Sequence, residues 1–202
     1  MTYIKTGVEQ PGIVELLLYK GSTGKALSNL AHTLLHGPSN LSAGERELIA
    51  SYVSNLNNCE FCYCSHSASA NVHLKDQGDT VRCLVQDPDT APVSEKMKAL
   101  LNIASKVQQS GKAVTQQDID WAKAKGATDE DLHDTVLIAA AFCMYNRYVD
   151  GLDTQLAEED DYADMGKRLA KKGYKYPPLF LRKFVIWLLN RKAKNKTKTH
   201  RE

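Results

Sequence analysis

Apolar residues recur at spacings of three and four along almost the whole chain, and this periodicity limits the possible folds more than any other feature. An amphipathic α-helix buries a stripe with that spacing, whereas a half-buried β-strand needs alternating apolar and polar residues. No window of the sequence sustains such alternation. The pattern predicts an all-α bundle, with helices near residues 12–19, 26–36, 42–56, 59–76, 94–110, 115–125, 128–150, 155–171 and 179–192.

Four of these helices begin with residues that stabilise a helix N-terminus. In the capping box Ser42-x-x-Glu45, a hydroxyl and a carboxylate bind backbone N–H groups that have no partner inside the helix. The other three starts are Thr115-x-x-Asp118, Thr128-x-x-Asp131 and Ser94. These caps fix where the helices start more closely than periodicity does.

The stretch from Leu132 to Met144 is apolar nearly all round, so we expect it to form a buried central helix. Its longest uninterrupted apolar run, residues 136–145, is far shorter than the roughly 20 residues that span a bilayer. Residues 1–12 contain charges and no long apolar run, which is unlike a secretory signal. The cysteine count of five is odd, which argues against a secreted disulfide scaffold. We therefore expect a soluble, cytoplasmic protein.

Charge is divided unevenly along the chain. Residues 1–166 contain 13 Lys/Arg and 23 Asp/Glu, whereas residues 167–202 contain 13 Lys/Arg and one Glu. This division predicts an acidic helical domain over 1–166, with a redox core at 41–76 and a second helical half at 94–153. A basic C-terminal helix and tail follow over 167–202.

Two interpretations of the basic end remain open. A basic amphipathic helix is able to lie on an anionic membrane surface or to bind an acidic partner. The interpretation that we favour is that the face bearing Trp187 docks on a neighbouring subunit, and that the last ten residues are a solvated, disordered end. Nucleic-acid binding is not expected, because the body is acidic and no recognition motif is present.

Cys59-x-x-Cys62-x-x-x-His66 carries the clearest chemical signal in the chain. Residues three and four positions apart meet on one face of a helix, so the two thiols lie within reach of a disulfide and the imidazole follows one turn later. A thiol needs a base, a cation or a helix N-terminus to expose its thiolate near neutral pH. We expect Asn57 or Asn58 to cap this helix and Cys59 to lie in its first turn.

A carboxylate on the preceding helix completes the candidate redox centre. Glu47 lies 12 residues before Cys59, on a segment that the break near Asn57 would fold back toward the cysteine helix. It is therefore a candidate to orient His66 or to exchange a proton with it, whereas Glu45 is assigned to capping.

The same side chains also allow simpler interpretations. The two cysteines are alternatively small buried hydrophobes. Zinc is a further alternative at Cys59, Cys62, Cys64 and His66, but Cys64 points about 200° away from Cys62 around a helix. Cys64 is thus expected to serve packing, and Cys143, inside the buried helix, to be inert.

The remaining histidines and one polar pair have several explanations. His32 and His36 form an i,i+4 pair. Three explanations of this pair stay open: it binds a metal ion, it faces the active site, or it is structural. His73 lies near the face of His66 and is a candidate pocket wall. Asn146 and Arg147 are interpreted as structural or interfacial.

The residues from 41 to 66 resemble the AhpD-like alkylhydroperoxidase family, within the wider carboxymuconolactone decarboxylase superfamily. The chain looks most like its uncharacterised peroxidase-related branch. The pattern that carries the resemblance is Leu41-Ser42-x-x-Glu45-x-Glu47-x-Ile49-x-x-x-Val53-Ser54-x-x-Asn57-x-Cys59-x-x-Cys62-x-x-x-His66.

This resemblance implies an all-α, AhpD-like, oligomeric bundle with Cys62 as the peroxidatic cysteine and Cys59 as the resolving one. It also implies that Glu47 and His66 form a proton relay. Phe61 is a departure, because the best-studied pattern has a second histidine there, and this bears on the strength of the relay.

The combined prediction is a thiol peroxidase or disulfide oxidoreductase that reduces hydroperoxides, with organic hydroperoxides favoured. No Rossmann fingerprint or flavin motif is present, so no bound cofactor is expected. Electrons would come from a partner dithiol protein of the thioredoxin-like or lipoyl kind. The alternatives are a lyase resembling carboxymuconolactone decarboxylase, and a non-enzymatic oligomeric module that senses redox state or binds metal.

Overall fold

The computed structural model describes residues 2–76 and 78–199, with side-chain placement through residue 195. All regular structure in these residues is helical, as the periodicity predicted. The helices are α1 Ile13–Tyr19, α2 Gly21–His36, α3 Ala43–Leu56, α4 Glu60–Leu74, α5 Asp79–Gln86, α6 Glu95–Gln109, α7 Gln116–Ala124, α8 Asp129–Asp150, α9 Glu159–Lys172 and α10 Arg182–Thr199, with short 3-10 turns at Gly111–Ala113 and Leu179–Leu181.

The capping predictions are confirmed at all four helix starts. Complete capping boxes begin α3, α7 and α8, and the Ser94 hydroxyl accepts the backbone N–H of Met97 at the start of α6. Each box satisfies two backbone N–H groups in the first turn, which is why these boundaries were readable from residue types alone.

One helix start and one short helix in the first half of the chain differ most from the expectation. The second helix begins at Gly21 rather than near residue 26, because Gly24 lets its backbone pack directly on Leu17 of α1. A Cβ at position 24 would meet the Leu17 carbonyl oxygen at 1.9 Å. The short helix α5 was missed altogether. It has no side-chain cap and buries only Thr80, Val81 and Leu84 against its neighbours.

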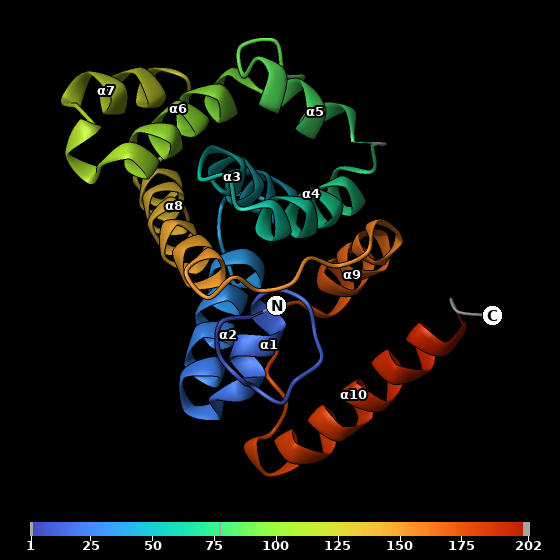
Figure 1. Ribbon diagram of the computed structural model, residues 1–202. Helices are drawn as coiled ribbons and strands as arrows, with labels where there is room; N and C mark the ends of the chain where they lie inside the picture. The colour runs from blue at the N-terminus through green and yellow to red at the C-terminus, as the bar shows by residue number, and fades with distance from the viewer. Residues whose placement is uncertain (1, 77, 200–202) are drawn as a thin grey trace.

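The core is built around α3, which is buried along most of its length. Helix α3 packs against α4, α6 and α8, and α4 is in turn covered by α9 (Figure 1). At one point α9 lies almost on the α4 backbone, since a Cβ at Gly166 would be 2.5 Å from the carbonyl carbon of Ala68. Helix α4 is thus held on both sides.

Helix α8 is less buried than expected. Its inner face contributes Ile138, Phe142 and Tyr145 to the core, but Val136 and Met144 are 36% and 42% exposed. An all-round apolar composition therefore overestimated its burial, because only one face of α8 meets other helices of this chain.

The N-terminal segment and helix α10 lie side by side on one side of the molecule. Helix α10 runs along the outside near α1 and the N-terminal segment (Figure 1), where Asn190 Nδ2 donates to the Gly7 carbonyl at 2.9 Å. It continues to Thr199, so the expected disordered end after residue 192 is wrong as far as the description reaches, and residues 200–202 lie outside it. Among the described residues no helix is both long and apolar enough to cross a membrane.

Candidate functional site

The cysteine pair begins immediately after a sharp break between α3 and α4. Asn57 ends α3, Asn58 has a left-handed φ of 57°, and Cys59 is the N-cap of α4. Asparagine tolerates the left-handed region better than most residues, which explains its place at this turn. The expectation that Asn57 or Asn58 caps the helix, with Cys59 in its first turn, is therefore wrong by one or two positions.

A buried polar network fixes this turn against α8. Asn146 is fully buried; its Nδ2 donates to Ser54 Oγ at 3.0 Å, and its Oδ1 accepts Asn57 Nδ2 at 2.8 Å. Gln108 of α6 donates to Asn57 Oδ1 at 2.9 Å. The structural role expected for Asn146 is confirmed, whereas Arg147 is exposed and binds only the Cys143 carbonyl among its described contacts.

Both cysteines are buried in a small apolar cluster separate from the main core. Cys59 and Cys62 are 0% and 3% exposed, and they pack with Phe61, Val149 and Met165. A hydrogen bond to Cys62, followed by burial, raises the pKa of the Cys59 thiol far above its ordinary value. Cys59 therefore keeps its proton, and the expected activation of its sulfur by the helix dipole is outweighed.

His66 and Glu47 are in direct contact, as the sequence predicted. His66 Nδ1 lies 2.7 Å from Glu47 Oε2, and the carboxylate is completely buried. The ring meets Phe142 edge-on, with 4.6 Å between the ring centres. Since Nδ1 is committed to Glu47, proton exchange between His66 and a group in the neighbouring cavity would use Nε2.

Tyr174 joins this pair and was missed by the sequence analysis. Its hydroxyl donates to Glu47 Oε1 at 2.6 Å and lies 3.2 Å from His66 Nδ1, so each carboxylate oxygen has a partner. Burial and the adjacent Glu47 carboxylate raise the pKa of Tyr174 well above 10, so the phenol stays protonated as a donor.

Gly173 explains how Tyr174 reaches the site from the C-terminal part of the chain. It ends α9 with a φ of 64°, and a Cβ there would lie 2.4 Å from His32 Nδ1. Only glycine combines this conformation with so close an approach. The next backbone N–H, of Tyr174, donates to His32 Nδ1 at 3.3 Å.

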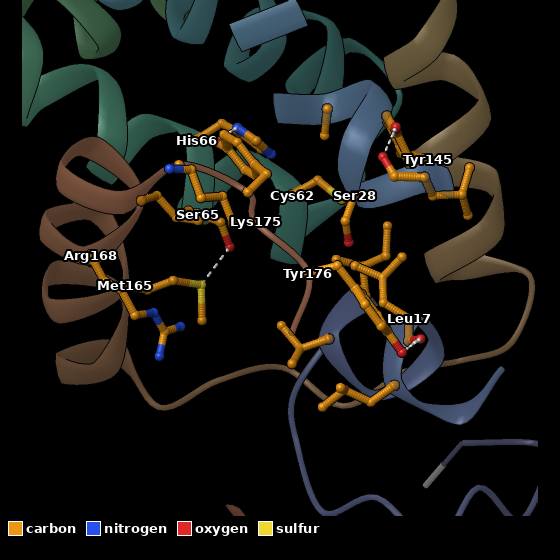
Figure 2. Close-up of a pocket in the computed structure, with 18 of the residues that line it drawn as sticks. Leu17, Ser28, Cys62, Ser65, His66, Tyr145, Met165, Arg168, Lys175 and Tyr176 are labelled. Carbon is orange, nitrogen blue, oxygen red and sulfur yellow. Dashed lines mark hydrogen bonds between the residues drawn. The ribbon is translucent and has the colours of Figure 1, made fainter. Parts of the chain in front are cut away.

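Cys62 and His66 line the same apolar cavity, of about 260 Å³ (Figure 2). Its walls come from α1, α2, α4, α8 and α9, and from the C-terminal segment that includes Tyr176, Val185 and Leu189. Phe61 also lines it, so the departure from the histidine of the best-studied pattern adds apolar surface. Arg168 and Lys175 supply positive charge among the lining residues.

The other cysteines and histidines considered in the sequence do not line this cavity. Cys64 is half-buried, and burial raises the pKa of its thiol. Cys143 is half-buried rather than fully buried. His73 was a candidate cavity wall, but it packs edge-on against the His36 ring instead, 5.9 Å between centres, and His36 stacks on His32. Burial lowers the pKa of His36 below 6.5.

Within the described residues, the side chains grouped closely enough to hold a metal ion are His36, Glu47 and His73. This group contains none of the cysteines. The zinc alternative at Cys59, Cys62, Cys64 and His66 therefore gains nothing from the geometry.

The comparisons with known proteins bear on the fold. No protein-family model and no curated protein matches the sequence. An uncharacterized peroxidase-related protein from Silicibacter sp. TM1040 has a similar structure, with a TM-score of 0.69 and 24% identity over 76% of this chain and 78% of that one. The alkylhydroperoxidase AhpD core of an uncharacterized peroxidase-related protein from Ralstonia eutropha JMP134 gives 0.69 and 25%, over 77% and 81%. The all-α, AhpD-like fold and the resemblance to peroxidase-related proteins are thereby confirmed.

Proposed function

We propose that this chain with an AhpD-like fold is a thiol peroxidase that reduces organic hydroperoxides through Cys62 and Cys59. One arrangement of side chains carries the proposal. Cys62 and His66 line a single apolar cavity, Glu47 contacts His66, and the thiol of Cys59 lies beside that of Cys62. A buried thiol, a base and a resolving thiol are the three groups that such a reaction needs.

In the first step Cys62 gives its thiol proton to His66, and the resulting thiolate attacks one peroxide oxygen. An S–O bond forms, the O–O bond breaks, and the leaving alkoxide takes a proton from His66 to become an alcohol. Cys62 is now a sulfenic acid and the hydroperoxide has been reduced by two electrons. The 2.7 Å contact to Glu47 supports this role of His66, because a buried carboxylate stabilises the imidazolium that passes the proton on.

In the second step Cys59 resolves the sulfenic acid. Its sulfur attacks the Cys62 sulfur, the S–O bond breaks, and water leaves as the disulfide forms. The raised pKa of Cys59 suits this order, because a thiol that keeps its proton does not compete with Cys62 for the peroxide. An external dithiol protein, of the thioredoxin-like or lipoyl kind, then returns two electrons and two protons.

The lining of the cavity favours an organic substrate. Its residues are mostly apolar or aromatic, including Ile13, Leu17, Phe61, Phe142 and Leu169. An alkyl or aryl group gains from burial there, whereas hydrogen peroxide gains nothing from apolar walls. We therefore expect cumene hydroperoxide to be consumed faster than hydrogen peroxide.

Thiol mapping by mass spectrometry tests the proposal. Reduced protein treated with one equivalent of cumene hydroperoxide should form a Cys59–Cys62 disulfide that dithiothreitol reverses. Cys62→Ser should abolish peroxide consumption, whereas Cys59→Ser should stop after one equivalent and accumulate a sulfenic acid that dimedone traps. Cys64→Ser is the matched control, because this thiol is on the same helix but does not line the cavity. Unchanged consumption by Cys62→Ser, or free thiols at both positions after treatment, would overturn the mechanism.

A further inference from the structure

A second cluster of potential ligands lies beyond Glu47. His36 at the end of α2, Glu47 of α3 and His73 in the last turn of α4 each direct a donor atom to one place, and these three atoms lie within 4.8 Å of one another. The two histidines are half-buried and Glu47 is fully buried. Three separate helices are thus required to build the cluster.

Two nitrogens in this cluster have nothing to bind. Nε2 of His36 and Nε2 of His73 are both buried, and neither has a hydrogen-bond partner among the residues that the structure describes. A buried polar atom without a partner destabilises a fold, so two of them in neighbouring side chains call for an explanation. A ligand at this place would satisfy both.

We propose that His36, His73 and Glu47 form a binding site for a zinc-like divalent transition-metal ion. Two imidazoles and one carboxylate are a common three-residue zinc set, whereas magnesium and calcium prefer oxygen ligands throughout. Ligand atoms on one tetrahedral zinc lie about 3.3 Å apart, given Zn–N and Zn–O distances of about 2.0–2.1 Å. Binding thus draws the three side chains together by small rotations, with water in the fourth position.

Because Glu47 belongs to both clusters, the metal site is linked to the cavity. A metal ion on the carboxylate competes with the bonds from His66 Nδ1 and the Tyr174 hydroxyl, at 2.7 and 2.6 Å. This link rests on the proposed peroxidase function. It makes the ion an inhibitor, since His66 loses the carboxylate that supports its proton transfer.

Calorimetry of the chelator-treated, reduced full chain with zinc chloride tests the site without reference to activity. We expect one ion per chain at the cluster and a dissociation constant at least about tenfold weaker in His36→Ala and in His73→Ala, because loss of a ligand costs more than loss of a supporting group. His133→Ala is the matched control, since His133 is exposed and pairs only with Asp134 among its described contacts. Binding that is absent in the wild type, or equal in His73→Ala, would overturn the site.

Cobalt(II) spectroscopy distinguishes this site from the cysteines, and the wild-type spectrum alone already decides whether thiolates bind the ion. Cobalt held by imidazole and carboxylate gives visible d–d bands alone, whereas thiolate ligands add an intense near-ultraviolet charge-transfer band. We expect the first spectrum in wild type and in Cys59→Ser/Cys62→Ser alike. Thiolate bands in wild type that vanish in the double variant would place the ion at the cysteines and refute the proposal.

Inhibition of peroxide consumption by zinc tests the link between the metal site and the cavity. Zinc should inhibit cumene hydroperoxide consumption by the wild type, whereas the ratio of the rates measured with and without zinc should stay close to one in His73→Ala. If zinc binds as expected but does not inhibit, the link fails and the site stands. If the zinc-free enzyme consumes no peroxide, the proposed function fails and the calorimetric result still decides the site.

Discussion

Glu47 is the residue on which most of the local chemistry converges. Its carboxylate is fully buried and accepts hydrogen bonds from His66 at one oxygen and from Tyr174 at the other. A buried charge is tolerated only when it is paired and hydrogen-bonded, so these two partners are what allow a carboxylate to exist inside the bundle.

Replacing Tyr174 by phenylalanine tests this arrangement. We expect the free energy of unfolding to fall by about 1–3 kcal/mol, because ionised Glu47 loses one of its donors. We also expect slower peroxide consumption, because the carboxylate that supports His66 loses one of its two hydrogen-bond partners. Chemical denaturation and the rate of cumene hydroperoxide consumption measure the two effects.

Tyr176→Phe is the matched control, because the Tyr176 hydroxyl donates to the Leu17 carbonyl and not to the relay. An equal loss of peroxide consumption in this control, or an unaltered rate in Tyr174→Phe, would remove Tyr174 from the site.

For single residues of the candidate site, the sequence predicted contacts only between residues that lie close together along the chain. The contact between Glu47 and His66 followed from helix spacing and one break, since 19 positions separate them. Tyr174 is 127 positions from Glu47 and belongs to no motif, so nothing in residue type or spacing marked it. Its position depends on Gly173, whose φ and close approach to His32 are visible only in three dimensions.

Among the helices, α7 shows how one side chain joins two elements. Asp118 forms the capping box with Thr115 at the start of α7, and it also accepts a hydrogen bond from Lys106 Nζ of α6 at 2.5 Å. Bonding to Lys106 and to the Thr115 backbone holds the pKa of Asp118 well below 3.8. The carboxylate therefore stabilises the fold only while it is charged.

Asp118→Asn should lower the free energy of unfolding by about 1 kcal/mol at pH 7. A depressed folded-state pKa gives stability that is complete above the unfolded value of 3.8 and is lost as pH falls below it. The difference between wild type and variant in urea unfolding should therefore stay constant at higher pH and shrink as the pH falls below about 4. Asp120→Asn is the control on the same helix, because Asp120 is exposed and bonds Gln116. A difference that stays constant with pH would contradict the assignment.

The helices illustrate which local signals are sufficient. Capping boxes were read correctly because their bonds are made within four residues. The start of α2 was misplaced because packing of Gly24 on Leu17 outweighs the poor helix propensity of glycine. Helix α5 was missed because two turns offer too few periodic positions to stand out.

For the whole molecule, the sequence predicted a helix in the basic C-terminal part of the chain, where α10 lies, but the partner of this helix was not readable. The exposed side chains Phe180, Phe184 and Trp187 leave an apolar face on this segment, and docking on a second subunit stays a prediction. Within the chain, α10 is held by Arg182, whose Nη1 donates to the Leu18 and Tyr19 carbonyls, and by Asn190.

These contacts make the C-terminal part of the chain a cover for the cavity that contains Cys62. Val185 and Leu189 of α10 line that cavity, while Asn190 accepts the Glu9 N–H and donates to the Gly7 carbonyl, so the N-terminal segment helps to hold α10 in place. Each of these bonds contributes about 1 kcal/mol, and local opening depends on their sum. The double variant Arg182→Ala/Asn190→Ala lacks these bonds. It should therefore favour the form in which α10 is detached from the rest of the chain by roughly tenfold or more.

The measurement is the rate at which iodoacetamide alkylates Cys62 in reduced protein, followed by peptide mapping. We expect the double variant to react about tenfold faster under conditions where global unfolding is unchanged, because only α10 has been loosened. Arg191→Ala is the matched control on the same helix, since Arg191 lies over the Trp187 ring at 5.6 Å and does not line the cavity. Equal rates in wild type and double variant would mean that substrates reach Cys62 by a route that α10 does not cover, and the cavity entrance would then have to be sought between α1 and α9.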